Sequence, residues 1–526
     1  MEKKIFDVII IGSGIGGLAS ASILSQVYHK RVLVLERHSK LGGYTHTFKR
    51  KAKYQWDVGV HYVGDMLPQS PIRRYFDYIS GGQLHWNKMP SPYDVFIYPD
   101  ITFEAKVGKE NLLNDLMTQF PTEKESLVQY FKDIEKAAGW YSKYLISNSV
   151  PKMVKPLTNI FTGSGKAFAL QTTKNYLDNH FRDKWLKSIL VSQWGDYGLP
   201  PALSAFCIHA MIVNHYINGG WYPVGGASKI AETISAVVEN TGGQFLKSHQ
   251  VDEIIIHKNK AIGVRVTAGQ KEKRQEEFFA DKIISDIGAY NTFINLVPSK
   301  YLIPFREDIT NFPKCTSNVS LFIGLNGDPH LSWVNGENYW IYNSFDHNKI
   351  FHSRNELLDG KASHAFVSFP SLKDPEKEHH TAEIIAFTGY GAFKQWANQP
   401  VKNRHADYNA LKERISKALI DFVHASLPNF KPLIEYYELG TPLTNEHYTG
   451  HHRGCSYGLP GIPERFQKQW LRPKTLIKNL YLTGADTATH GVVPCMMSGI
   501  LSATLAMGRL QDMIKITKVA KRFSNS

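Results

Sequence analysis

Six residues near the start of the chain, Gly12 to Gly17, have the spacing of a turn that holds a dinucleotide. They read Gly12-Ser13-Gly14-Ile15-Gly16-Gly17 and satisfy the pattern G-x-G-x-x-G. Such glycines allow a tight bend and let a pyrophosphate approach the unpaired N–H groups at a helix N-terminus. Glu36 follows about 20 residues later, where a carboxylate can accept hydrogen bonds from both ribose hydroxyls. An acid here favours a free 2′-hydroxyl, which leaves FAD and NAD.

A second group of residues with the chemistry of a flavin site lies near the other end of the chain. Gly484-Ala485-Asp486 follows an apolar run, and Gly491-Val492-Val493 precedes a segment of small and apolar residues. An acid just past a strand can bond a ribityl hydroxyl, and a helix N-terminus stabilises the negative charge of a reduced flavin. The alternative for Asp486 is a simple turn residue. This group favours FAD over NAD.

The elements that must position these residues form a βαβ unit. Apart from Asp7, Phe6–Ile11 is an apolar, β-branched run typical of a buried parallel strand, Leu18–Val27 is the predicted helix, and Arg31–Glu36 is the next strand. The same sheet is predicted to resume with strands at Gln244–Lys247, Glu253–His257, Ala261–Val266, Lys282–Ser285 and Asn479–Thr483, and to end with a helix at Met496–Leu510.

Between these segments the pattern changes, so we predict an α/β fold: a discontinuous Rossmann-like FAD-binding domain with an inserted α+β substrate domain. The FAD-binding domain is predicted to comprise residues 1–67, 221–291 and 441–526, the last with a basic tail. The substrate domain is predicted to comprise residues 68–220, which are mainly helical, and residues 292–440, which form a β-sheet.

Composition and charge distribution limit the kinds of partner that the protein is expected to bind. The chain has 526 residues and a net charge of +14, but its basic residues are spread out, which predicts no nucleic-acid module. Only the tail concentrates them, at Lys515, Lys518, Lys521 and Arg522, which suits either a solvated helix end or a peripheral membrane contact. The four cysteines are scattered without metal-ligand spacing, so we expect no metal site, no disulfide framework and a reducing compartment.

Two stretches resemble membrane or export signals, and neither is interpreted that way. The apolar run at Val8–Leu24 contains glycines that would break a signal helix, so we expect no signal peptide and a cytoplasmic protein, peripheral on the inner face of a membrane at most. Tyr197–Ser228 contains no Asp, Glu, Lys or Arg, but its prolines, glycines and asparagines indicate buried interior.

A resemblance to a known superfamily joins these motifs. Glu36-Arg37, followed after four residues by Gly42-Gly43, looks like the second phosphate and ribityl loop of the flavoproteins that include amine oxidases and phytoene desaturases. Their C-terminal strand, Gly-x-Asp and helix match Gly484 to Val493, and Val251 matches the position that contacts adenine through the backbone. The resemblance implies FAD.

Four further stretches resemble the retinol saturase and carotenoid isomerase branch of that superfamily, namely Trp56–Gly64, Gly220–Gly226, Ile284–Ala289 and Gly440–Thr444. The segment with His490, Pro494 and Cys495 matches neither enzyme. The branch implies hydride transfer between FAD and a carbon–carbon double bond of a lipophilic polyene, carotenoid-like or retinoid-like, or of another unsaturated lipid. Saturation, desaturation and isomerisation all fit this chemistry. An FAD-dependent amine oxidase and a non-catalytic flavin- or lipid-binding protein are the alternatives.

Candidates for the chemistry itself are few. His61 and Tyr62 can donate or accept a proton beside a double bond, although a flavin-supporting or core role also suits His61. His447, His451, His452 and Arg453 would bind a polar substrate end or form an exposed loop, and Cys495 is read as a packed thiol rather than a flavin attachment point. No second G-x-G-x-x-G is present, so NAD(P)H would dock transiently as electron donor, unless quinone or oxygen exchanges the electrons.

Overall fold

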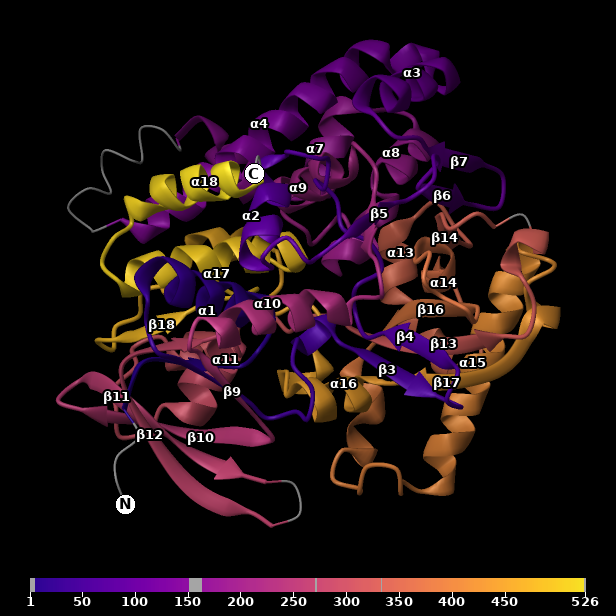
Figure 1. Ribbon diagram of the computed structural model, residues 1–526. Helices are drawn as coiled ribbons and strands as arrows, with labels where there is room; N and C mark the ends of the chain where they lie inside the picture. Colours follow the sequence, from indigo (N-terminus) through magenta and orange to yellow (C-terminus); the bar gives the residue numbers. More distant parts are fainter. Residues whose placement is uncertain (1–4, 151–162, 270–271, 333, 525–526) are drawn as a thin grey trace.

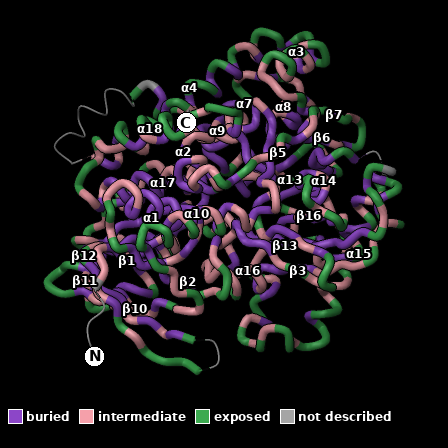
Figure 2. The backbone as a smooth tube through the Cα atoms, in the orientation of Figure 1, coloured by how far each residue is buried: buried purple, intermediate pink, exposed green. Residues whose placement is uncertain are grey.

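The computed structural model describes residues 5–150, 163–269, 272–332 and 334–524. Two seven-stranded sheets lie side by side in the molecule, each with its own covering helices (Figure 1). Buried backbone follows the central strands of both sheets, whereas the outer loops and the far sides of the helices are exposed (Figure 2). The α/β fold class predicted from the sequence is confirmed.

The first sheet has the order β10-β11-β12-β1-β2-β9, and β18 also pairs with β12. Its strands are β1 (Ile5–Ile11), β2 (Val32–Glu36), β9 (Gln244–Lys247), β10 (His249–His257), β11 (Lys260–Ala268), β12 (Arg274–Ser285) and β18 (Leu480–Leu482). β1 runs parallel to both β2 and β12. The carboxyl ends of the central parallel strands therefore meet at one edge, where ligands bind in open α/β sheets.

Coverage of both faces explains why β1 and β2 are apolar except at Asp7 and Glu36. Val8 and Ile10 pack with residues of α1 (Ile15–Tyr28), α10 (Ser228–Asn240) and α17 (Val492–Ala506). Ile9 and Ile11 point to the opposite face and pack with residues of β10, β11 and the segment after β12. A strand covered on both faces needs apolar residues at every position.

β12 is longer than the sequence suggests. The sequence predicts a strand only at Lys282–Ser285, but β12 has 12 residues, and its first half pairs antiparallel with β11. Its second half lies between β1 and β18. The first half is largely polar and exposed, so its pattern does not distinguish it from a loop.

The second sheet has the order β17-β13-β16-β15-β14-β6-β7. Its strands are β6 (Asp94–Ile97), β7 (Thr102–Ala105), β13 (Ser317–Leu325), β14 (Asn338–Tyr342), β15 (His364–Ser368), β16 (Thr381–Thr388) and β17 (Ile434–Gly440), and α15 (Ala406–Ser426) packs on it. β6 and β7 lie in the segment where the sequence indicates helices. Each has four residues, too few for a clear alternation.

Helices α4 (Lys124–Ser149) and α9 (Phe206–Tyr216) pack together beside the second sheet. α9 comes from the uncharged stretch, and its first five residues are buried, as expected for interior. None of the helices in the described part of the chain combines the length and the apolar character needed to cross a bilayer.

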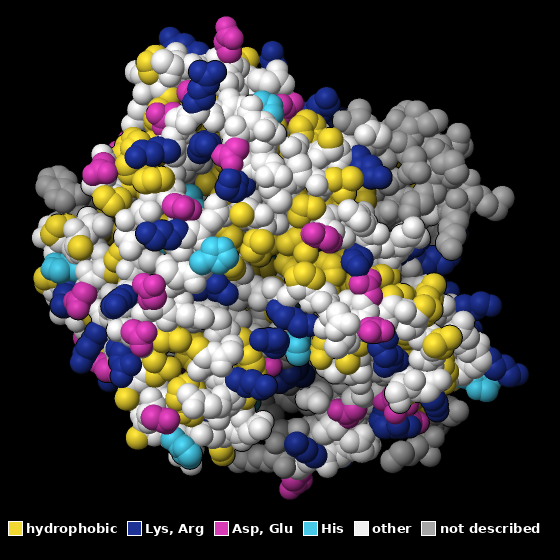
Figure 3. Space-filling view, turned by 180° about the vertical axis from the view of Figure 1, so that it is seen from behind, with side chains coloured by type: hydrophobic (Ala, Val, Ile, Leu, Met, Phe, Trp, Pro, Cys, Tyr) yellow, Lys and Arg dark blue, Asp and Glu magenta, His cyan; other side chains and the backbone are white. Residues whose placement is uncertain are grey.

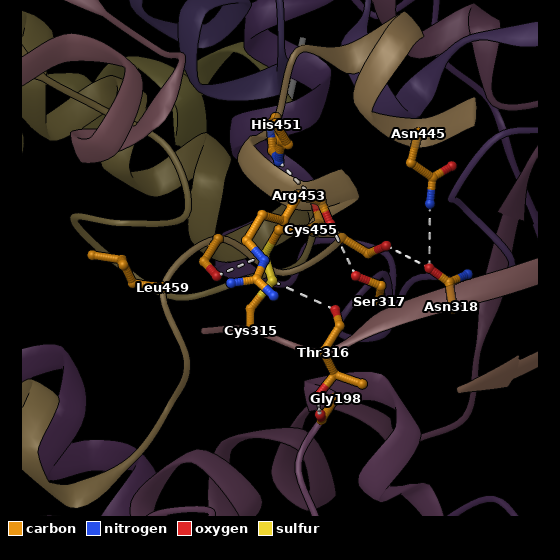
Figure 4. The surroundings of a disulfide bond; sticks show 12 residues. Gly198, Cys315, Thr316, Ser317, Asn318, Asn445, His451, Arg453, Cys455 and Leu459 are labelled. Atoms are coloured by element: carbon orange, nitrogen blue, oxygen red, sulfur yellow. Dashed lines mark hydrogen bonds between the residues drawn. A yellow bond between two sulfur atoms is a disulfide. The ribbon is translucent and has the colours of Figure 1, made fainter. Parts of the chain in front are cut away.

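Cys315 and Cys455 correct the expectation that no disulfide forms. They are 140 residues apart in sequence, but their Cα atoms lie 5.8 Å apart and their sulfurs are bonded (Figure 4). Cys315 precedes β13, and Cys455 lies in the loop after α16 (Pro442–Thr449), which starts where β17, the partner of β13, ends. Sheet pairing brings the two cysteines together, and their sequence spacing does not show this.

Candidate active site

A single cavity of about 790 Å³ runs from the glycine turn after β1 to the gap between α4 and α9. Its walls come from both sheets, from α17 and from the loop that carries His61 and Tyr62. Ligand pockets commonly have volumes of about 300–1,000 Å³. One chamber therefore connects the nucleotide motif to the segment predicted to bind substrate.

At the nucleotide end the wall is mainly backbone. Gly12 has φ of +93°, and a Cβ added to Gly16 would lie 2.5 Å from Asp286 Oδ1 and 3.0 Å from the Gly484 amide nitrogen. Gly43 lies against Gly14, where an added Cβ would be 3.3 Å from the Gly14 Cα. The turn therefore has space for the close approach of a ligand but none for side chains.

Glu36 lies at the end of β2, directly beside this turn. Its carboxylate accepts hydrogen bonds from the Ser13 amide at 3.0 Å, the Ser13 hydroxyl at 2.6 Å and the His38 amide at 2.8 Å. These bonds orient the carboxylate in the cavity wall, where a ribose would meet it. Glu36 thus both shapes the turn and offers the predicted acceptor.

The N-terminus of α17 forms another part of the cavity wall. The cavity is lined by Gly491, Val492 and Val493 at the start of this helix and by Gly484 after β18. His490, just before the helix, is buried, and its Nε2 has no hydrogen-bond partner among the described residues. Burial lowers the pKa of His490 to about 3, so its ring is neutral. A neutral ring with an open nitrogen and a helix N-terminus fits the polar edge of a flavin.

Most of the predicted site residues line this one cavity, including both catalytic candidates, His61 and Tyr62. The predicted cofactor residues in its wall are Gly12, Ser13, Gly14, Ile15, Gly16, Glu36, Arg37, Gly42, Gly43, Val251, Gly484, Gly491, Val492 and Val493. Gly17 and Asp486 do not line it. The Asp486 carboxylate instead accepts hydrogen bonds from the amides of Ala289 at 2.6 Å and Leu459 at 2.7 Å, and so joins two loops.

Asp286 is a half-buried acid against the glycine turn. It follows β12, and its carboxylate oxygens are the atoms nearest to a Cβ built on Gly14 or Gly16. Burial raises the pKa of Asp286 to about 7, and the charge of Glu36 adds to this effect, although the Gly17 amide opposes it. A group that titrates near neutral pH thus lies where an anionic pyrophosphate would bind.

His61 and Tyr62 lie farther along the cavity, on the loop after β4 (Tyr54–Asp57). His61 Nδ1 is 3.1 Å from Glu383 Oε2, and its ring contacts the Phe366 ring edge-on. The Tyr62 ring stacks on Tyr216 with centroids 4.1 Å apart. Tyr62 Oη is 3.1 Å from Asp94 Oδ2 and 2.8 Å from Asp196 Oδ2.

Sequence reasoning missed the ionisable groups around Tyr62. The Lys373 ammonium is buried and donates to the Ser368 hydroxyl at 2.8 Å and the His61 carbonyl at 3.0 Å, and it also contacts Asn338. Burial lowers the pKa of Lys373 to about 8, and burial raises the pKa of Asp94 to about 6. For Asp196, the available signal was a single acid among aromatic residues immediately before the uncharged stretch.

The far end of the cavity is a mostly apolar channel between two helices. Its lining from α4 and α9 includes Ala138, Tyr141, Ser142, Leu145, Ile146, Ile208, Met211 and Ile212, with Asn148 and Asn214 as polar members. Ser142 and Ile146 are exposed, so the channel reaches the surface there. Among the aromatic residues in and beside the uncharged stretch, Tyr216 lines the cavity, whereas Trp194, Tyr197, Trp221 and Tyr222 are buried core.

Of the basic cluster in the 447–453 segment, only His451 lines the cavity. Its Nδ1 lies 3.0 Å from the Cys455 carbonyl oxygen, in the loop that the disulfide fastens to β13 (Figure 4). His452 stacks on Tyr290 instead, with centroids 3.9 Å apart. Cys495 also lines the cavity, and burial raises the pKa of its thiol, as expected for a packed, unreactive cysteine.

Comparison with known proteins agrees with this geometry. Residues 10–79 match the family model described as an NAD(P)-binding Rossmann-like domain. The fold resembles cyclohexylamine oxidase from Brevibacterium oxydans, with a TM-score of 0.59, 14% identity, and coverage of 97% of this chain and 99% of that one. The fold, the glycine turn and the cavity define a flavin-dependent oxidoreductase.

Sequence relatives identify the branch. The chain is 34% identical to all-trans-retinol 13,14-reductase of Danio rerio, over 99% of this chain and 88% of the relative, and 31% identical to that of Rattus norvegicus, over 96% and 86%. The chloroplastic prolycopene isomerase of Arabidopsis thaliana is 24% identical over 95% of this chain and 82% of its own length. The chain therefore belongs to the all-trans-retinol 13,14-reductase family, and the resemblance predicted from the four stretches is confirmed.

Proposed function

We propose that this protein binds FAD and reduces a carbon–carbon double bond of a retinoid-like polyene. The observation that carries the proposal is the continuity of the cavity, which passes from the glycine turn, past Tyr62, into the apolar channel between α4 and α9. The names of the relatives support reduction, and their similarity over nearly the whole chain supports the same substrate class.

The residues of the nucleotide end have separate proposed tasks. The glycine turn receives the pyrophosphate, Glu36 the ribose, and the N-terminus of α17 the polar edge of the flavin ring. When bound and reduced, the flavin supplies a hydride. His61 and Tyr62 lie where a proton must be held beside the reacting double bond. NAD(P)H, docking transiently, is the proposed source of the two electrons.

We also propose that substrate comes from a membrane surface beside α18 (Asp512–Phe523), which packs on α2 (Pro71–Ile79) (Figure 1). Ile516 of α18 is buried, whereas Ile514 is 65% exposed and the basic residues of the tail face solvent. Met513, at the start of the helix, lines the cavity. On the opposite side of the molecule from Figure 1, acidic and basic side chains are interspersed (Figure 3).

Charge reversal of Lys518 and Lys521 should reduce sedimentation of the protein with phosphatidylserine vesicles. Unchanged sedimentation would contradict the proposed membrane contact of α18.

The test uses the purified protein loaded with FAD and reduced with dithionite without oxygen. Addition of all-trans-retinol should restore the absorbance of oxidised flavin and yield a product heavier by two hydrogens. Release of hydrogen peroxide on a panel of amines would instead indicate an amine oxidase. A flavin that retinol never reoxidises would overturn the proposal, and conversion to an isomer without flavin oxidation would indicate an isomerase.

A further inference from the structure

Tyr62, Asp94 and Asp196 form a hydrogen-bonded chain in the cavity wall, here called the carboxyl–phenol chain. The Tyr62 oxygen lies within hydrogen-bond distance of both carboxyl groups, 3.1 Å from Asp94 and 2.8 Å from Asp196. A phenol has one proton and can donate only one of these bonds. The other bond requires a proton on a carboxyl group, which then donates to the phenol oxygen. The chain as a whole therefore holds two protons.

The surroundings of Asp94 favour its ionised form. Asp94 Oδ1 accepts a hydrogen bond from the Asn338 amide at 2.8 Å, and Asp94 Oδ2 accepts one from the Gln193 amide at 2.8 Å. Burial raises the pKa of Asp94 to about 6, but these hydrogen bonds and the charge of Lys373, which contacts Asn338, oppose that rise. Donors and a nearby positive charge stabilise a carboxylate, so Tyr62 donates its proton to Asp94.

Asp196 has the opposite surroundings. Among the described residues, Tyr62 is the one side chain that forms a hydrogen bond with it. Burial raises the pKa of Asp196 well above its usual range, and the charge of Asp94 adds to this effect. Asp196 is therefore the carboxylic acid of the chain, and it lines the cavity together with His61 and Tyr62.

We propose that Asp196 is the proton donor of the reduction and that Tyr62 is its positioning residue, a role that rests on the proposed function. The π bond of the substrate breaks as one carbon receives the hydride and its neighbour receives the Asp196 proton. Two electrons pass from the reduced flavin to the substrate, and a carboxylate remains at Asp196. Water entering from the channel mouth reprotonates it before the next turnover.

The groups around Asp196 set the expected pH dependence. Tyr62 faces it from the loop after β4, Asp94 from β6, Tyr216 from α9 and Lys373 from α14 (Pro370–Lys373). The phenols Tyr93, Tyr197, Tyr342 and Tyr457 surround this group. Because burial raises the pKa of Asp196 well above its usual range, the rate should fall as the pH rises through that raised pKa and the acid ionises.

The experiment compares Asp196→Asn with a matched control, Asp133→Asn. Asp133 is a buried acid that, like Asp196, is bonded to one phenol, that of Tyr176 at 2.9 Å, but it does not line the cavity. Each holoenzyme is reduced with dithionite and mixed either with all-trans-retinol or with ferricyanide, which takes electrons without a proton transfer to carbon. Infrared spectra of the resting proteins record the C=O stretch of protonated carboxyl groups.

We expect Asp196→Asn to slow flavin reoxidation by retinol by about 10²–10⁴-fold while leaving reoxidation by ferricyanide unchanged. It should also lose one protonated-carboxyl band, and Asp196→Glu should restore part of the rate. Asp133→Asn should change neither reaction. A normal retinol rate in Asp196→Asn, or no lost band, overturns the donor role while the proposed function stands. If retinol does not reoxidise the wild-type flavin, the proposed function fails, and the donor role fails with it.

Discussion

The two ends of the cavity are built from different components of the polypeptide. At the nucleotide end the wall is backbone, with glycines packed so closely that a Cβ at Gly16 would lie 2.5 Å from Asp286. At the substrate end the wall is side chains, contributed by separate elements and held by contacts such as those of Tyr62 and Lys373. Tight backbone tolerates little change, whereas a side-chain wall can be altered one group at a time.

The largest expected effect is at the backbone end. In Gly16→Ala the added Cβ has no space, so the turn must move away from the Gly484 amide, 3.0 Å from that Cβ. We expect FAD affinity to fall by more than about 100-fold, or roughly 2.7 kcal/mol, in a titration followed by flavin fluorescence. Gly139→Ala is the control, because its Cβ would meet nothing within 4 Å. Equal FAD affinity of both variants would mean that this turn does not hold the cofactor.

Glu36 is the side chain at the nucleotide end that we expect to bind the ribose. Glu36→Ala removes the acceptor for ribose and also the bonds to Ser13 and His38, so FAD affinity should fall by about 1–3 kcal/mol. Glu36→Gln keeps the shape and an acceptor oxygen and should lose less. Thermal unfolding of the apoproteins separates loss of ribose binding from loss of the turn. Unchanged affinity in Glu36→Ala would remove the ribose role.

Asp286 should make FAD binding depend on pH. Its pKa of about 7 is raised above the ordinary value, and an adjacent pyrophosphate favours the protonated form further. FAD affinity should therefore be highest below pH 7, where Asp286 is protonated, and should fall by up to about tenfold per pH unit above it. The Asp286→Asn variant, whose side chain cannot ionise, should bind FAD with the same affinity from about pH 6 to about pH 9. Asp281→Asn, at an exposed acid of β12, should keep the wild-type dependence of FAD affinity on pH. A wild-type affinity that does not change with pH would contradict the mechanism.

The difference between the backbone wall and the side-chain wall explains how much of the site the sequence could predict. Gly12 to Gly17 are consecutive, and Glu36 follows one strand and one helix later, so local spacing revealed the nucleotide end. Asp94, Asp196 and Lys373 belong to elements that only tertiary packing brings together, and a single acid or lysine has no spacing to recognise. The Cys315–Cys455 disulfide was missed for the same reason. The hydrogen bonds that Asp486, a predicted cofactor residue, accepts from the amides of Ala289 and Leu459 also depend on tertiary packing and could not be predicted.

The smallest expected effect is in the channel, and it should leave the nucleotide end unaffected. Ile212 lines the channel from α9 and is only partly buried, so Ile212→Phe narrows the substrate path without overfilling a packed core. We expect the KM for all-trans-retinol to rise by about three- to tenfold with little change in kcat or FAD affinity. Leu302→Phe, at a side chain 90% exposed elsewhere, is the control for added bulk. If KM stays at the wild-type value, the polyene does not pass between α4 and α9; if FAD affinity changes as well, the two ends are not independent.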